Sequence, residues 1–94
     1  MEINIQSIHF DADIKLIDFI KKKLGKLETL NNKVINTEVF LKLDNAVDNA
    51  NKITEIKLHL PGKTLFAKEQ CKTFEEATDL SVESLRRQLA KLKN

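Results

Sequence analysis

The side chains best suited to covalent chemistry in this sequence are one cysteine, Cys71, and two histidines, His9 and His59. A thiol beside an imidazole would form a nucleophile with its general base. Both histidines lie in stretches with the alternation of a strand, and a lone histidine on a strand is usually structural. With two glycines, the chain has no glycine-rich phosphate loop. The sequence therefore predicts no catalytic residue, no cofactor and no metal site, and it leaves the roles of these three residues open.

Basic residues form a more informative pattern. Residues 21–26 include four lysines and no acid. On a helical wheel, Lys15, Lys22 and Lys26 lie within about 40° of each other and opposite the apolar stripe, while Lys23 borders the stripe. Lys22 and Lys26 are an i, i+4 pair of like charge, which destabilises an isolated helix by a few tenths of a kcal/mol. An anionic partner would remove this cost.

The end of the chain repeats the arrangement. Residues 84–94 hold four cations and no acid, whereas residues 74–83 hold four acids and no base. Arg87 and Lys91 are again an i, i+4 pair, and Arg86 lies on a flank of the predicted buried stripe. Acids early and bases late in a helix also complement its dipole, so this order has a purely structural explanation. Two neighbouring helices with the same pattern would instead form a basic groove that recognises phosphate and shape.

Composition fits one small globular domain. The 94 residues are 41% hydrophobic and 32% charged, with a net charge of +2. The single cysteine indicates a reducing compartment, and no signal peptide or apolar membrane span is visible, so we expect a cytoplasmic protein. The chain has no Trp or Tyr, and its five Phe are scattered along the sequence. The sequence therefore does not predict a platform for stacking single-stranded bases.

Hydrophobic periodicity predicts six elements. Strands are expected over residues 2–10, 33–44, 52–60 and 63–72, and helices over 11–30 and from Thr73 to the end. In the first strand the alternation slips at Gln6-Ser7, which suggests a bulge or burial on both faces. Asp11 or Asp13 can cap the first helix, and Thr73 with Glu76 fits a capping box for the second. Residues 45–51 form a polar, hairpin-type connection.

This β-α-β-β-β-α order predicts an α+β fold. We expect a two-layer sandwich in which two helices pack on one face of a four-stranded, mainly antiparallel sheet. Ile35 and Leu43 are assigned to the same strand face as Thr37, Val39 and Leu41. Leu92 is assigned to the buried stripe of the last helix. The predicted core residues are Ile3, Ile5, Ile17, Ile20, Leu24, Leu41, Leu58, Phe74, Leu85 and Leu89.

Three segments carry a resemblance to a known family. They are LGKLETL, LPGKTLFAKEQ and TFEEATDLSVESLRRQLAKLK. Together they resemble the short form of the ribosome hibernation-promoting factor and ribosome-associated inhibitor A family, also described as sigma-54 modulation or ribosomal subunit interface proteins. The resemblance implies a factor that is not an enzyme. It would bind the small ribosomal subunit in the channel for messenger and transfer RNA and inhibit translation under stress or in stationary phase.

The resemblance also implies partners and contact residues. The partners are the small subunit and its ribosomal RNA, with no membrane, no small-molecule substrate and a monomer off the ribosome. Lys23, Lys26, Arg87 and Lys91 match the family's RNA contacts. With the residues chosen on the helical wheels, the candidate RNA-binding set is Lys15, Lys22, Lys23, Lys26, Arg86, Arg87 and Lys91.

Some expectations differ from the family pattern, and others stay open. Some relatives carry a lysine where this chain has Ser84. Residues 1–94 are expected to be a single ribosome-binding domain without the C-terminal extension by which long forms pair ribosomes. A small double-stranded RNA-binding module, or a protein-interaction domain whose basic faces only aid solubility, remain alternatives. The affinity, the exact RNA contacts and the effect on ribosome dimers are not predicted.

Overall fold

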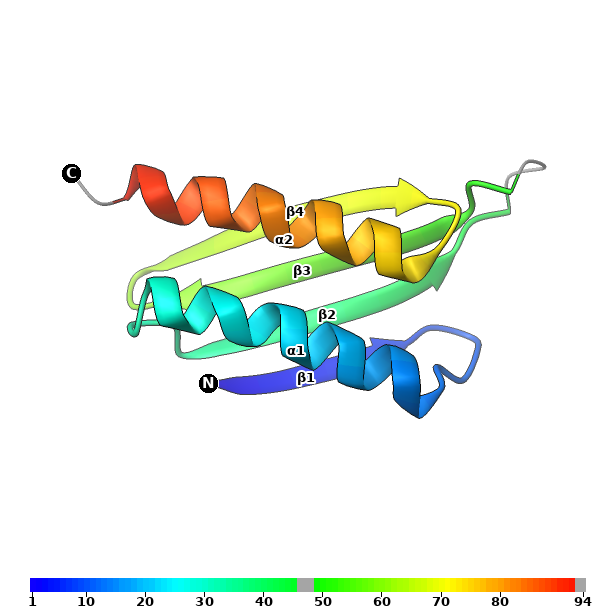
Figure 1. Ribbon diagram of the computed structural model, residues 1–94, viewed down its shortest axis with the longest axis horizontal. Helices are drawn as coiled ribbons and strands as arrows, with labels where there is room; N and C mark the ends of the chain where they lie inside the picture. The colour runs from blue at the N-terminus through cyan, green and yellow to red at the C-terminus, as the bar shows by residue number, and fades with distance from the viewer. Residues whose placement is uncertain (46–48, 93–94) are drawn as a thin grey trace.

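The computed structural model describes residues 1–45 and 49–92, so residues 46–48 of the expected hairpin connection lie outside the described residues. Six elements follow the predicted order (Figure 1). They are β1 (Glu2–Ser7), α1 (Ile14–Leu30), β2 (Asn36–Leu43), β3 (Lys52–Leu60), β4 (Lys63–Cys71) and α2 (Phe74–Lys91). The two helices form one layer and the sheet forms the other, which confirms the predicted sandwich.

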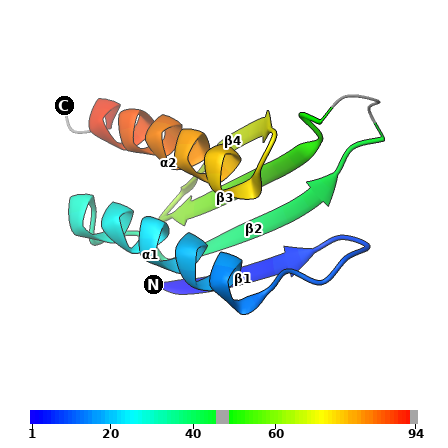
Figure 2. The same ribbon diagram turned by 45° about the vertical axis from the view of Figure 1, so that its right-hand side comes forward.

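Strand order in the sheet equals sequence order, β1-β2-β3-β4 (Figure 2). β2, β3 and β4 pair antiparallel, as the short connections between them require. β1 pairs parallel with β2, because α1 carries the chain back along the sheet between them. The prediction of a mainly antiparallel sheet is therefore confirmed, with one parallel pair at its β1 edge.

This topology makes the two helices parallel to each other. β1 and β4 point in the same direction, since β2 is parallel to β1 and two antiparallel pairings follow. Each helix follows one of these strands and returns across the sheet, so both helices begin at the same end of the molecule (Figure 1). Their C-terminal halves consequently lie at the opposite end, next to each other.

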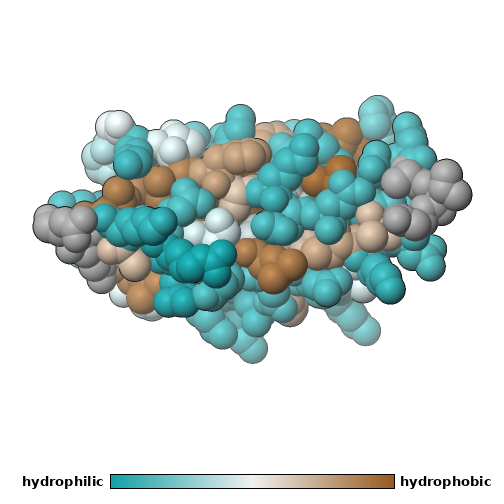
Figure 3. Space-filling view, turned by 90° about the horizontal axis from the view of Figure 1, so that it is seen from above, coloured by the Kyte–Doolittle hydropathy of each residue, from teal (hydrophilic) through white to brown (hydrophobic). Residues whose placement is uncertain are grey.

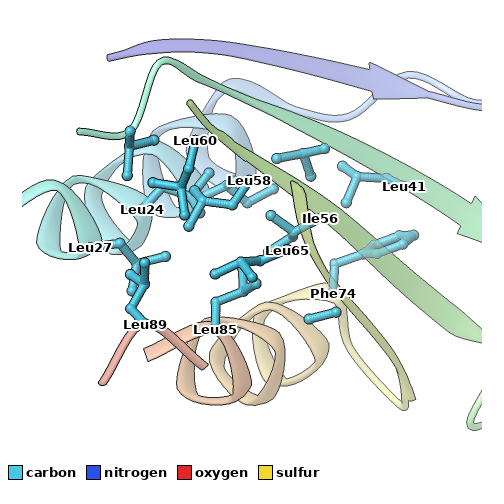
Figure 4. Close-up of a cluster of buried hydrophobic side chains, with 14 of the residues drawn as sticks. Leu24, Leu27, Leu41, Ile56, Leu58, Leu60, Leu65, Phe74, Leu85 and Leu89 are labelled. Atoms are coloured by element: carbon cyan, nitrogen blue, oxygen red, sulfur yellow. The ribbon is translucent and has the colours of Figure 1, made fainter. Parts of the chain in front are cut away.

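The core fills the space between the two layers (Figure 4). Its fully buried aliphatic side chains come from both helices and from the central strands: Ile20, Leu24, Leu27, Val39, Leu41, Ile56, Leu58, Leu85 and Leu89. Figure 4 shows Leu27 of α1 close to Leu89 of α2. Phe10 and Phe74 stack with ring centroids 5.2 Å apart. This contact ties the segment before α1 to the start of α2.

Side-chain caps define where both helices begin. The Asp13 carboxylate accepts a hydrogen bond of 2.8 Å from the Leu16 backbone N–H. Thr73 Oγ1 accepts one of 3.1 Å from the Glu76 backbone N–H. Each bond satisfies a donor that the first helical turn leaves unpaired. Asp13, rather than Asp11, is thus the cap of α1, and the prediction of Thr73 as the cap of α2 is confirmed.

The expectation for the first strand is partly wrong. β1 ends at Ser7, and His9 adopts a left-handed backbone with φ of 66°. The slip in alternation therefore marks the end of the strand, and not a bulge or burial on both faces. Ile3 and Ile5 are only partly buried, because β1 is an edge strand, and Ile17 of α1 is likewise only partly buried.

Three residues that periodicity assigns to the apolar face of a strand or to the buried stripe of the last helix prove to be exposed. Ile35 precedes β2 and is 56% exposed, and Leu43 ends β2 with 47% exposed. Leu92 follows α2 and is 38% exposed. All three continue the periodicity of an element past the part that the opposite layer covers. Periodicity identifies a face, but it does not show how far along that face the neighbouring layer extends.

Candidate functional site

Helix α1 presents a basic surface to solvent. Lys15, Lys22 and Lys26 are all exposed. The opposite side of the helix holds its four buried residues, Leu16, Ile20, Leu24 and Leu27. The helical-wheel prediction that these lysines lie opposite the core is therefore confirmed. In the described part of the chain, none of the three lysines forms an ion pair.

Lys23 occupies a different position from the other lysines of α1. Its Nζ lies 3.1 Å from Asp79 Oδ1 of α2 and 5.4 Å from the centre of the Phe19 ring. The side chain is partly buried. Lys23 thus joins the two helices through an ion pair, and its charge is already partly neutralised within the protein.

Helix α2 holds two arginines around one carboxylate. Arg86 Nε and Nη2 donate to the Glu83 carboxylate at 3.0 and 2.5 Å, and Arg87 Nη1 lies 3.9 Å from Glu83 Oε1. The hydrogen bond from Arg86 is the main cause that lowers the pKa of Glu83, and the same bond raises the pKa of Arg86. Glu83 therefore accepts two hydrogen bonds from Arg86 and offsets part of its charge.

Contacts of α2 show which way its cations face. A cavity of about 110 Å³ is lined by Leu30 of α1 together with Arg86, Leu89 and Ala90, so Arg86 lies on the side of α2 nearest α1. On the opposite side, Gln88 donates a 3.0 Å hydrogen bond to the Phe66 carbonyl of β4. Arg87 is exposed between these two flanks, on the solvent side of the helix.

Lys91 ends α2 and is also exposed. It stands one turn beyond Arg87 on the same surface. Figure 3 shows the molecule from the side of α2 and β4, where hydrophilic side chains cover most of the surface and apolar ones form separate patches. The fourth cation of the terminal cluster, Lys93, lies outside the described residues.

Acidic side chains limit the basic surface at the N-terminal half of α2. Glu75, Glu76 and Asp79 are exposed there, and Glu83 is partly exposed. Asp79 points toward α1, as its contact with Lys23 shows. The predicted basic groove is therefore not uniform. Apart from Lys15 in the first turn of α1, its cations lie from the middle of α1 and in the C-terminal half of α2, and acids occupy the start of α2.

The residues considered for catalysis do not come together. Cys71 is buried on the helix-covered face of the sheet, whereas His59 lies on the opposite face. His9 is exposed after β1, at the sheet edge remote from β4. Burial raises the pKa of the Cys71 thiol, and Glu76 and Glu69 raise it further, so the thiolate is disfavoured.

His59 belongs to a hydrogen-bonded cluster across three strands. Its Nε2 lies 2.7 Å from Glu38 Oε2, and its Nδ1 lies 3.0 Å from Thr64 Oγ1. Because the carboxylate only accepts, Nε2 donates to Glu38, and in the neutral ring Nδ1 accepts from the Thr64 hydroxyl. The cluster lies on the surface of the sheet and satisfies its own polar groups. A structural role therefore accounts for His59.

Neither a cluster of metal-ligating side chains nor a helix able to span a membrane occurs among the described residues. Residues 1–45 and 49–92 contain no group of three His, Cys, Asp or Glu side chains that could hold a metal ion. Within those ranges, neither helix has an apolar stretch long enough to cross a membrane.

One contact between a lysine and an aromatic ring was not predicted from the sequence. Lys57 Nζ of β3 lies 5.7 Å from the centre of the Phe40 ring of β2, on the sheet face that no helix covers. Strict alternation in both strands assigns these residues to that face. Their proximity depends on strand register, which the sequence did not predict.

Comparison with curated proteins identifies relatives over nearly the whole chain. A Pseudomonas putida protein named ribosome hibernation promoting factor is 29% identical over 93 residues, which cover 99% of this chain and 87% of the relative. An Azotobacter vinelandii protein of the same name is 27% identical over 93 residues, which cover 99% of this chain and 83% of that relative.

Solved structures show the same fold. A ribosomal subunit interface protein from Coxiella burnetii superposes with a TM-score of 0.86 at 24% identity, covering 99% of this chain and 98% of that one. The N-terminal domain of Thermus thermophilus Protein Y superposes with a TM-score of 0.85 at 22% identity. The match covers 99% of this chain and 100% of that one. The family model described as sigma 54 modulation protein / S30EA ribosomal protein matches residues 3–94. The chain therefore belongs to this family, which confirms the resemblance carried by its motifs.

Proposed function

We propose that this protein is a ribosome hibernation factor. In this proposal the domain of residues 1–94 binds the small ribosomal subunit in the channel for messenger and transfer RNA and inhibits translation under stress or in stationary phase. It acts by occupying the channel and performs no chemistry of its own. The names of the Pseudomonas putida and Azotobacter vinelandii relatives support the hibernation role.

One structural observation supports the mode of binding most directly. Parallel helices α1 and α2 lie side by side, and both direct exposed cations away from the core: Lys15, Lys22, Lys26, Arg87 and Lys91. Ribosomal RNA offers closely spaced phosphates, which such cations can contact without reading base sequence. Lys23 and Arg86 complete the proposed set, although each also has an acidic partner within the protein.

The alternative of a double-stranded RNA-binding module has less support than a hibernation factor. The N-terminus of a helix attracts phosphate through its unpaired N–H groups. In α2 this end carries Glu75 and Glu76, both exposed, and their charges repel phosphate. Binding through the C-terminal halves of both helices avoids these acids.

Sedimentation with ribosomes tests the proposal. The double variant Arg87→Glu, Lys91→Glu should lose co-migration with small subunits in a sucrose gradient, whereas the wild-type protein co-migrates at low salt and dissociates as salt rises. A control variant, Lys33→Glu, Lys63→Glu, produces the same change in net charge at exposed positions outside the helices. It should keep binding.

Three results would contradict the proposal. Unchanged binding of the Arg87, Lys91 variant would exclude α2 as the contact surface. Equal loss in the control would show that only net charge matters. Tighter binding of naked duplex RNA than of small subunits would favour the double-stranded RNA module.

A further inference from the structure

The sheet face opposite the helices is open to solvent. Both helices pack on one side of the sheet, so alternate residues of each strand face outward on the other (Figure 2). Of the five phenylalanines, Phe10, Phe19 and Phe74 lie in the core or pack against it. Phe40 and Phe66 lie on the open face, and Phe66 is 46% exposed. Every phenylalanine outside the core is therefore on this one face.

Strand register aligns these two rings with a lysine. Lys57 of β3 lies directly opposite Phe66 of β4. It is diagonal to Phe40 of β2, since Phe40 is opposite Glu55, and its Nζ lies 5.7 Å from the Phe40 ring centre. Neighbouring strands are about 4.8 Å apart, so the two rings lie on strands about 10 Å apart with the ammonium group between them.

The acids nearest this row direct their carboxylates to partners other than Lys57. Glu55 accepts from Lys42 at 2.8 Å and lies 3.9 Å from Lys68. Glu38, although directly across from Lys57, directs its carboxylate to His59 at 2.7 Å. Among the described residues Lys57 forms no ion pair, and its recorded contact is with an aromatic ring. The centre of the face thus combines one exposed ring, Phe66, and one partly exposed ring, Phe40, with a lysine that forms no ion pair among the described residues.

We propose that this row of Phe40, Lys57 and Phe66 binds single-stranded RNA. One base stacks on each ring, and Lys57 contacts the phosphate between them. Aromatic rings stack bases of any type, and a cation beside them adds attraction for the backbone. Four-stranded sheets with helices on one face are known to stack bases on aromatic residues of the other. An apolar protein segment would cover the rings but leave Lys57 without an anion.

This site is independent of the helix surface proposed for ribosome binding. The two lie on opposite layers of the molecule, so either proposal can fail while the other holds. The scattered positions of the phenylalanines in the sequence gave no sign of a stacking platform. The antiparallel register of β2, β3 and β4 brings two of them to one face.

Fluorescence anisotropy with a labelled, unstructured nine-nucleotide uridine RNA tests the site on the full chain. Phe66→Ala and Phe40→Leu together should weaken binding at least tenfold, as the loss of two stacking contacts predicts. Lys57→Gln should reduce the dependence of binding on salt by about 0.7 in a plot of log K against log salt, the value for one phosphate on a single strand. Asn4→Ala, an exposed change on the same face, should have no effect. Circular dichroism checks that each variant is folded.

The helix variant Arg87→Glu, Lys91→Glu separates the two surfaces. In this background, the two phenylalanine substitutions should weaken binding of the uridine RNA by the same factor as they do in the wild-type protein. Loss of binding in this variant, with none in the phenylalanine variant, would overturn the proposal and assign single-stranded RNA to the helices. No binding by the wild-type protein at low salt would also overturn it. If a glutamate-rich nonapeptide binds with dependence on Phe66 while RNA does not, the face is a peptide site instead.

Discussion

Helix α1 contains a glycine, Gly25, at an interior position between Lys22 and Lys26. Glycine in a helix interior costs about 0.5–1 kcal/mol relative to alanine, because it loses more backbone freedom on folding. A Cβ built at Gly25 meets no atom within 4 Å outside the local helix backbone, so an alanine side chain has room. We therefore expect Gly25→Ala to stabilise the protein by about 0.5–1 kcal/mol.

The chain offers a matched control in Gly62, its only other glycine. A Cβ there also meets nothing within 4 Å, but Gly62 has φ of +73°, in the turn that it forms with Pro61. A non-glycine residue in this left-handed region costs about 1–2 kcal/mol. Gly62→Ala should therefore destabilise the protein, even though the two sites are equally open. Comparing the two variants therefore separates the effect of backbone conformation on stability from the effect of side-chain packing.

Thermal unfolding followed by circular dichroism measures both effects. For a domain of this size, 1 kcal/mol corresponds to about 4–8 °C in Tm, so Gly25→Ala should raise Tm by about 2–8 °C and Gly62→Ala should lower it by about 4–16 °C. Ribosome binding of Gly25→Ala should be unchanged, because Lys22 and Lys26 stay exposed. A lower Tm for Gly25→Ala would refute a regular α1 helix at this position, and with it the alignment of the lysines.

Two further predictions concern Glu83 and Cys71. Glu83→Gln should tighten binding to ribosomal RNA, because Arg86 then becomes available to one more phosphate. The slope of log K against log salt should become steeper by up to about 0.9. Weaker binding would show that Glu83 holds Arg86 in the binding orientation. Since the folded Cys71 thiol has a raised pKa, its contribution to stability is full below the unfolded pKa of about 8.5 and is lost as pH rises from there through the folded pKa. Unfolding in urea between pH 7 and 10 should show this loss in the wild-type protein and less of it in Cys71→Ala, and iodoacetamide should modify folded Cys71 much more slowly than the unfolded thiol.

Sequence patterns predicted most of the fold because each element has a strong local signal. The caps at Asp13 and Thr73 and the apolar stripes of both helices identify their starts and buried sides. Apart from the partly buried Ile3, Ile5 and Ile17, the errors are at the ends of elements. Ile35 and Leu92 satisfy the periodicity of their elements, yet they project beyond the opposite layer and remain exposed. How far one layer covers the other is a tertiary property that local pattern does not contain.

The candidate site was predictable only in part, for a related reason. A helical wheel correctly separates Lys22 and Lys26 from the core, since that depends on one helix alone. The ion pair of Lys23 depends on how α2 lies against α1, so no wheel could show it. The pair of Glu83 and Arg86 did have a sequence signal, their i, i+3 spacing.

Whether the cations serve the helix dipole or an external phosphate can be argued from where each one lies. In α2 the last turn contains Lys91, so dipole compensation accounts for that residue. In α1 the last turn contains no basic residue, and the effect of the dipole is confined to the terminal turns. The dipole therefore does not explain Lys22 and Lys26, a repulsive pair in the middle of the helix. Neither lysine forms an ion pair among the described residues, so both remain available for the phosphate contacts that we propose.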